Sequence, residues 1–157
     1  MIPELKGYAV VFATTHGLFH KALEGLTPEQ AMERHDGANP ILWVAAHTVA
    51  VRAGFSKGLG APVDLPWGKS FARGAEVKDV TAWPTLTEVR AKWDEVHAAF
   101  LARVVALSSE EVAATTQAPG LDGTLLGTVG LAAIHDAYHI GQLAAARRLH
   151  GLDRVVG

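Results

Sequence analysis

Cysteine is absent from this sequence of 157 residues. The chain can therefore form no disulfide bond, and it offers no thiolate as a nucleophile or as a metal ligand. A bound metal would need histidine, carboxylate or water as its ligands. Sulfur chemistry, if the protein performs any, would need a sulfur atom that arrives on a co-substrate.

The sequence also lacks a basic stripe and a membrane-length apolar run. Its 14 basic and 16 acidic residues are scattered and leave a net charge of -2, so we expect no nucleic-acid partner. The longest strongly apolar stretch, residues 41–51, is interrupted by His47 and is far shorter than the ~20 residues of a membrane span. The first residues, with Glu4 and Lys6 among them, do not have the layout of a secretory signal. We therefore expect a cytoplasmic protein with no membrane partner.

Apolar residues recur at steps of three and four along four long segments, which is the spacing of amphipathic or buried helices. The expected helices cover about residues 3–25, 40–58, 85–104 and 124–150. No alternating strand pattern is present, and residues 59–84 contain mainly glycine, proline and isolated aromatics. The sequence predicts an all-α protein, a four-helix bundle with a long crossover between helices two and three. Its length suits a single domain over residues 1–157.

Several polar residues mark the expected helix starts. Asn39 is expected to cap the second helix, with Pro40 at its first position. Thr85 and Glu88 have the spacing of a capping box for the third helix. Thr124 is expected to cap the fourth.

The fourth helix carries the first candidate metal ligands, His135 and His139. Their spacing of four residues places both imidazoles on one helical face, where they can bind one ion. Two ordinary histidines, one at the core edge and one near solvent, would fit the spacing as well. Leu131 and Leu143 make this face apolar, and buried imidazoles need partners there.

His47 on the second helix is the third candidate. Its neighbours three and four positions away, among them Trp43 and Val51, are apolar, so its side chain should point into the protein. A core histidine bonded to a backbone carbonyl would also explain it. Metal sites in helical bundles are built from inward side chains on facing helices, so the three histidines together predict one buried divalent-metal site with open positions.

The other histidines of the sequence fit a buried metal site less well than His47, His135 and His139. His16 and His20 also have a spacing of four residues, but they lie beside the apolar stripe of the first helix, and we interpret both as surface or boundary residues. His97 is expected at the packed boundary of the third helix. His35 and His150 fall at helix ends and are expected to be exposed.

Two motifs on these helices resemble the DinB/YfiT-like superfamily over nearly the whole chain. They are Trp43-x-x-x-His47 after an Asn-Pro helix start, and His135-x-x-x-His139-x-Gly141-Gln142-Leu143. The resemblance implies a bundle in which His47, His135 and His139 bind a divalent ion, zinc or nickel in most reports. That group includes thiol-dependent S-transferases and a mycothiol-dependent isomerase, so its fold does not identify the reaction.

Our leading hypothesis is a metal-dependent enzyme, a transferase or hydrolase, acting on a small-molecule substrate with a low-molecular-weight thiol as one candidate. Gln142 is a candidate for orienting a ligand. In the crossover, Trp67, Lys69 and Arg73 are candidates for substrate recognition, although charged loop residues are more often merely solvated.

Two other classes of function stay open. One is a binding protein, without catalysis, that stores or senses a metal or small ligand. The other is a helical interaction module, which would not explain three inward histidines. The apolar second and fourth helices could also supply a dimer surface, and we expect a homodimer.

Overall fold

The structure, a computed structural model, describes residues 1–35, 37–75 and 80–157. Within these ranges the regular elements are helices, and the β-type pairing is limited to an isolated bridge between Thr115 and Thr124. The all-α class is confirmed. The four long helices are α1 Pro3–Leu23, α3 Ile41–Gly58, α4 Leu86–Ala106 and α6 Leu125–Leu149. The shorter ones are α2 Pro28–Met32, α5 Ser109–Ala113 and the two 3-10 helices, η1 Gly68–Phe71 and η2 Val80–Ala82.

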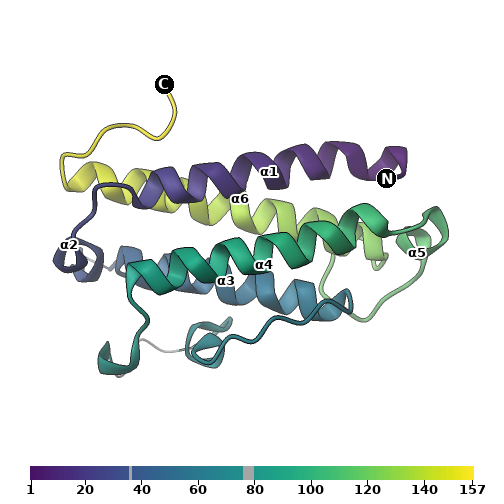
Figure 1. The fold of residues 1–157 in the computed structure, drawn as a ribbon, viewed down its shortest axis with the longest axis horizontal. Coiled ribbons are helices and arrows are strands. Elements are labelled where there is room, and N and C mark those ends of the chain that lie inside the picture. The colour runs from purple at the N-terminus through teal and green to yellow at the C-terminus, as the bar shows by residue number, and fades with distance from the viewer. Residues whose placement is uncertain (36, 76–79) are drawn as a thin grey trace.

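The long helices pack side by side in a fixed order around the core. Helix α1 packs against α4 and α6, and α3 packs against the same two helices. In Figure 1, α3 and α4 run in one direction while α1 and α6 run in the other. The chain between α3 and α4 therefore returns from one end of the protein to the other, passing η1 on its way. The α3/α6 and α1/α4 interfaces lie on different sides of the core.

The helix starts follow the sequence signals, with one exception. Thr85 accepts a hydrogen bond from the Glu88 backbone N–H, and the Glu88 carboxylate accepts one from the Thr85 N–H, so the predicted capping box is present. Thr124 caps α6 as expected. The expectation for Asn39 is wrong: the residue at the N-cap of α3 is Pro40, with no side-chain cap. Because the ψ angle of Pro40 is 150°, its backbone is still extended and the helix begins at Ile41.

The core between the helices is rich in aromatic residues. Phe12 from α1 and Phe100 from α4 meet edge to face, with ring centroids 4.9 Å apart. Phe19 and Trp93 stack at 4.5 Å. These residues are fully buried, and aromatic pairs of this kind contribute about 0.5–1.5 kcal/mol beyond their buried area. The core therefore fixes the relative positions of α1 and α4.

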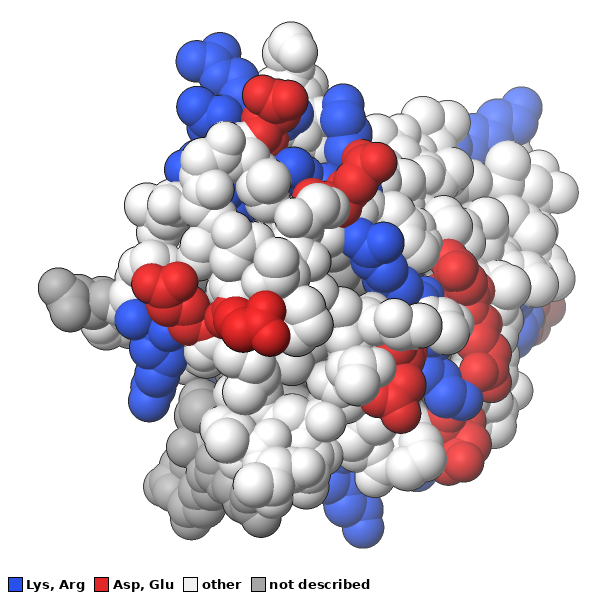
Figure 2. Space-filling model, turned by 60° about the vertical axis from the view of Figure 1, so that its left-hand side comes forward, with Lys and Arg blue, Asp and Glu red and all other residues white. Residues whose placement is uncertain are grey.

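Charged side chains of both signs are interspersed on the face of the protein drawn in Figure 2. That face has no field of a single sign, in agreement with the scattered charges of the sequence. In the described ranges, none of the helices is both apolar enough and long enough to span a bilayer.

Candidate metal centre

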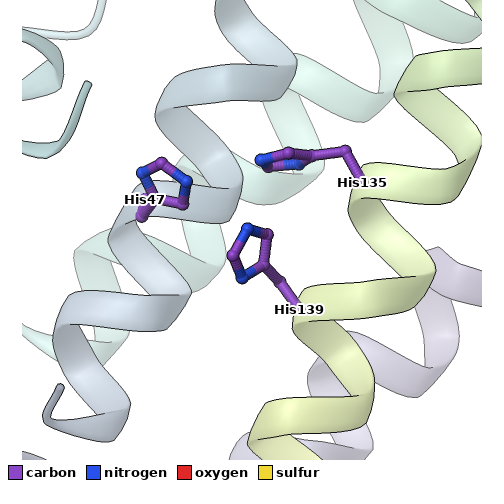
Figure 3. A group of neighbouring side chains, drawn as sticks. All are labelled: His47, His135 and His139. Carbon is purple, nitrogen blue, oxygen red and sulfur yellow. The ribbon is translucent and has the colours of Figure 1, made fainter. Parts of the chain in front are cut away.

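The three predicted ligands meet between α3 and α6. Their ring centroids are 5.3 Å apart for His47 and His135, 4.8 Å for His47 and His139, and 4.4 Å for His135 and His139. Figure 3 shows the three rings facing a common space between the helices. One ring nitrogen from each lies within 4.8 Å of the other two. Nitrogen ligands of one tetrahedral zinc ion are separated by about 3.3 Å, since each Zn–N bond is about 2.0–2.1 Å.

The ring of His47 is held by two neighbours. Trp43, one helical turn earlier, stacks on it with centroids 5.0 Å apart and planes within 8° of each other. The Nδ1–H of His47 donates to the Phe71 carbonyl oxygen at 2.7 Å. This bond fixes the tautomer and leaves the Nε2 lone pair free, which is the usual arrangement of a metal-binding histidine.

Phe71 reaches this position because the crossover is anchored by aromatic packing. Its side chain is fully buried and contacts the rings of Trp67 and Trp83 at centroid distances of 5.6 and 5.4 Å. The segment that contains η1 is therefore held against α3, and the Phe71 carbonyl is presented to His47. A bond from His47 to a backbone carbonyl was one of the sequence-based explanations of this residue, but no side-chain pattern could identify Phe71 as the partner.

His139 is oriented by a side chain on its own helix. Its Nδ1–H donates to Gln142 Oε1 at 2.7 Å, and Gln142 Nε2 donates to the Tyr138 hydroxyl at 3.2 Å. Gln142, expected to orient a ligand, thus holds a histidine and is absent from the residues that line the nearby cavity. It is a positioning residue in this geometry.

We expect Gln142→Ala to weaken divalent-metal binding by about 10–100-fold, the usual effect of removing an outer-shell partner of a histidine ligand. Gln142→Glu keeps an acceptor for the Nδ1–H and should retain most of the affinity. Competition with a chromophoric chelator measures the difference. Tyr138→Phe, which removes the next hydroxyl in the chain of hydrogen bonds, is the matched control and should change little.

The pKa of His135 is shifted furthest among the three histidines. Burial first, and then the proximity of His139, His47 and Arg52, lowers its pKa to about 3. Burial also lowers the pKa of His47 and of His139, while the hydrogen bonds that they donate to Phe71 and Gln142 oppose the shift. All three imidazoles are therefore neutral at pH 7, and the neutral form is the one that binds metal.

The apo protein should lose stability as the pH falls from about 6.5 towards 3. The pKa of His135 is about 3 in the folded protein against an ordinary value of 6.5, so over this window the unfolded chain binds the proton more strongly. Urea midpoints of chelator-treated protein should therefore decrease with falling pH. His135→Gln removes the titrating group and should flatten that dependence; an unchanged slope in this variant would contradict the assignment.

A buried ion pair lies directly behind His135. Asp136 pairs with Arg52 of α3, and both side chains are almost fully buried, with exposed fractions of 1% and 0%. The Arg52 guanidinium lies over the rings of Phe12, Trp93 and Phe100 at 4.6–4.9 Å. Burial lowers the pKa of Arg52 to about 9, so it still carries its charge at pH 7. The sequence analysis did not identify this pair.

A cavity of about 750 Å³ opens beside the three histidines. All three of them line it, together with mainly small and apolar residues of α3 and α6. Arg73 from the crossover also lines it, whereas Lys69 and Trp67 do not. Trp67 packs against Phe71, and Lys69 is exposed. Of the three crossover candidates, the structure places Arg73 alone at the cavity.

The remaining histidines differ in part from expectation. His16 and His20 are half-buried boundary residues, as expected, but both contact Asp94 of α4, which the sequence analysis did not identify. His97 is a half-buried boundary residue. The expected exposure of His35 and His150 is wrong, because both lie in partly buried positions. Only 6% of the His150 side chain is exposed, and its ring lies against His35 with centroids 5.3 Å apart.

The donor set fits a divalent metal ion. It consists of three neutral imidazoles, and the buried Nδ1 of His135 has no hydrogen-bond partner within the described part of the chain. A buried polar atom without a partner is costly unless another group satisfies it. Three histidine ligands with a cavity on one side are typical of a metal site that keeps an open coordination position.

Fold and site together define an all-helical protein with a cluster of three histidines suited to a divalent ion. The sequence model of the DinB superfamily matches residues 12–143. The match covers most of the chain, including all three histidines, and the chain belongs to the DinB superfamily. No curated protein matches the sequence.

Proposed function

We propose that this protein is a metal-dependent enzyme, a thiol-dependent transferase or a hydrolase, that acts on a small molecule in the cavity beside His47, His135 and His139. The observation that carries the proposal is the position of three neutral imidazoles in the wall of a cavity of about 750 Å³. In this proposal residues 1–157 form one domain, a four-helix bundle whose long crossover joins α3 to α4.

The proposed metal is zinc or nickel. Imidazole nitrogen suits both ions, and the chain has no cysteine that would favour a softer ion. A divalent ion held by the three histidines would supply Lewis-acid polarisation of a substrate atom. The contribution of the chain itself is to keep the imidazoles neutral and oriented, through the Phe71 carbonyl and Gln142.

The cavity favours a substrate with an apolar body and an anionic group. Its lining is mostly apolar, with side chains such as Val51, Phe55 and Leu131. Arg73 is exposed and lies at the same cavity, and a guanidinium binds carboxylate well. Low-molecular-weight thiols that carry a carboxylate match this chemistry, and the resemblance to thiol-dependent relatives points the same way.

The proposed transfer consumes a thiol and an electrophilic acceptor. The thiol loses its proton to solvent, and its sulfur forms a bond to the electrophilic carbon. The leaving group departs with the electron pair of the bond that breaks. In the hydrolytic alternative, water takes the place of the thiol.

One observation favours a second candidate, a binding protein without catalysis. Among the described residues that line the cavity there is no carboxylate and no lysine. The cavity therefore offers no general base apart from the histidines themselves. A protein that stores or senses a metal or a small ligand would not need such a base.

A turnover screen separates the two candidates. Metal-loaded protein is incubated with bacillithiol, mycothiol or glutathione and a set of electrophilic acceptors, and loss of free thiol is followed. Turnover that stops with chelator, and that is reduced in Arg73→Ala more than in Lys69→Ala, supports the enzyme. Tight binding of a thiol without turnover of any acceptor supports the binding protein instead.

The homodimer and the cytoplasmic location expected from the sequence stay predictions. Ile134 and Tyr138, one turn apart on α6, are large and more than half exposed, which is consistent with a surface that a second copy could cover. Size-exclusion chromatography with light scattering measures the oligomeric state, and cell fractionation the location.

A further inference from the structure

A second histidine cluster lies between α1 and α4, away from the α3/α6 interface. His16 and His20 project from one face of α1, four residues apart, towards Asp94 of α4. The Nε2 atoms of both rings lie 2.7 Å from the same carboxylate oxygen, Oδ1 of Asp94. Two separate hydrogen bonds could use both carboxylate oxygens. Instead, both rings converge on one oxygen, which brings three potential ligand atoms from two helices close together.

We propose that His16, His20 and Asp94 form a second binding site for a divalent transition-metal ion, independent of the three-histidine centre. One ligand atom from each residue lies within 4.8 Å of the others. Ligand atoms around one zinc ion are separated by about 3.3 Å. Small rotations of the two imidazoles away from Oδ1 would therefore open a position for the ion without movement of either helix.

The rings are held in place before any ion binds. The His16 ring stacks on His97, with centroids 4.1 Å apart and planes 19° apart, and more distantly on Trp93 at 6.1 Å. The Trp93 indole N–H donates to the His16 carbonyl oxygen at 3.3 Å. His20 lies edge to face with Phe19. Preorganised ligands lose less conformational entropy on binding and so bind more tightly.

The carboxylate is ionised when the ion would bind. Partial burial acts to raise the pKa of Asp94, but hydrogen bonds from His20 and His16, together with their electrostatic attraction, outweigh it, and the pKa is lowered. The nearby Lys92 is paired with Glu95 at 2.7 Å, and no hydrogen bond or ion pair to Asp94 is seen from it. The site therefore combines one negative charge with two imidazoles.

The ligand set indicates the class of ion. Two imidazoles and one carboxylate suit zinc, copper(II), nickel or cobalt, whereas magnesium and calcium prefer oxygen ligands alone. The side chains of His16 and His20 are about 30% exposed and that of Asp94 is 56% exposed. Solvent can therefore fill the remaining coordination positions, and binding should be weaker than at the buried centre.

Equilibrium dialysis against Zn²⁺, with metal quantified per folded chain, tests the site. The wild-type protein should bind two ions, one more weakly than the other. Asp94→Asn and His20→Gln should each weaken the second ion by at least about tenfold, the lower end of what even an outer-shell change costs. His47→Ala/His135→Ala should retain it. Circular dichroism confirms that each variant is folded. His150→Gln, which changes the third histidine group beside Glu33, is the matched control and should have no effect.

The outcomes separate this site from the proposed function. A single ion that is lost in His135→Ala and unaffected by Asp94→Asn would overturn the second site and leave the three-histidine centre intact. An ion lost in Asp94→Asn alone would support the second site and contradict the three-histidine centre.

Copper(II) electron paramagnetic resonance of the His47→Ala/His135→Ala protein gives an independent signature of the second site. Coupling to two nitrogens that His20→Gln reduces to one supports the site, and an unchanged spectrum overturns it.

Discussion

The His135→Ala variant is expected to lose nearly all tightly bound divalent metal while its helical content stays the same. His135 is one of three imidazoles that converge between α3 and α6, 4.4 Å from His139 and 5.3 Å from His47 between ring centroids. Removal of a ligand should weaken binding by more than the about 10–100-fold that loss of an outer-shell partner causes. Purified wild-type protein should carry close to one tightly held ion per chain, measured by elemental analysis.

The matched control for this variant is His97→Gln, a histidine of similar burial that belongs to none of the three histidine groups. It should retain the tightly held ion, because the ring that it stacks on, His16, belongs to the proposed weaker site. Circular dichroism and chelator competition of both variants separate loss of the ion from loss of the fold. Full retention of metal by folded His135→Ala protein would contradict the assignment of the three-histidine centre, and the proposed function would fail with it.

Local sequence signals were sufficient to predict the four long helices. The apolar spacing along residues 3–25 predicted a helix that the structure shows as Pro3–Leu23. The capping box at Thr85 and Glu88 marked the start of α4. These signals act within one turn, so a single segment contains all the information they need. The start of α3 was misplaced by one residue: Asn39 has the right chemistry for a cap, but the N-cap position is occupied by Pro40, whose backbone is extended.

The meeting of His47 with His135 and His139 was predicted from apolar surroundings and from the resemblance to a family. By contrast, the partners that hold these rings lie outside any local pattern. The acceptor for His47 is a backbone carbonyl 24 residues away, at Phe71. Contacts of this kind depend on how the crossover folds back, and side-chain identity alone carries no information about that path.

The pairing of Asp94 with His16 and His20 was missed for a related reason. The contacts join residues 78 and 74 positions apart. From the first helix alone, both histidines lie at the edge of the apolar stripe, and this position is typical of solvated residues. The carboxylate comes from a different helix, so its role becomes visible once α1 and α4 are packed together.

The buried pair of Arg52 and Asp136 was the largest omission. Asp136 faces the core and pairs with Arg52 from α3. In a sequence, a charged residue on an apolar helix is normally interpreted as a solvated side chain, because a partner on another helix cannot be recognised. In the structure the pair joins α3 to α6 next to His135, whose Nδ1 lies 4.0 Å from Asp136 Oδ1. It therefore supports the packing of α3 against α6 beside the metal centre.

The Asp136→Ala variant should be strongly destabilised, by about 3–5 kcal/mol, because it leaves the Arg52 charge buried without a partner. Three aromatic rings surround that guanidinium and cannot replace a carboxylate. Urea unfolding of the apo protein measures the loss. Glu95→Ala, which breaks an exposed ion pair with Lys92, is the matched control and should cost less than about 1 kcal/mol.

The double variant Arg52→Met/Asp136→Leu distinguishes a stabilising pair from one that merely satisfies two buried charges. Replacing a buried ion pair with apolar side chains of similar volume is often neutral or stabilising by about 1–4 kcal/mol, because neither charge then has to be desolvated. We expect the double variant to be more stable than Asp136→Ala by several kcal/mol. If Asp136→Ala alone is as stable as the wild type, the buried charge has found another partner, and the pair does not hold α3 to α6.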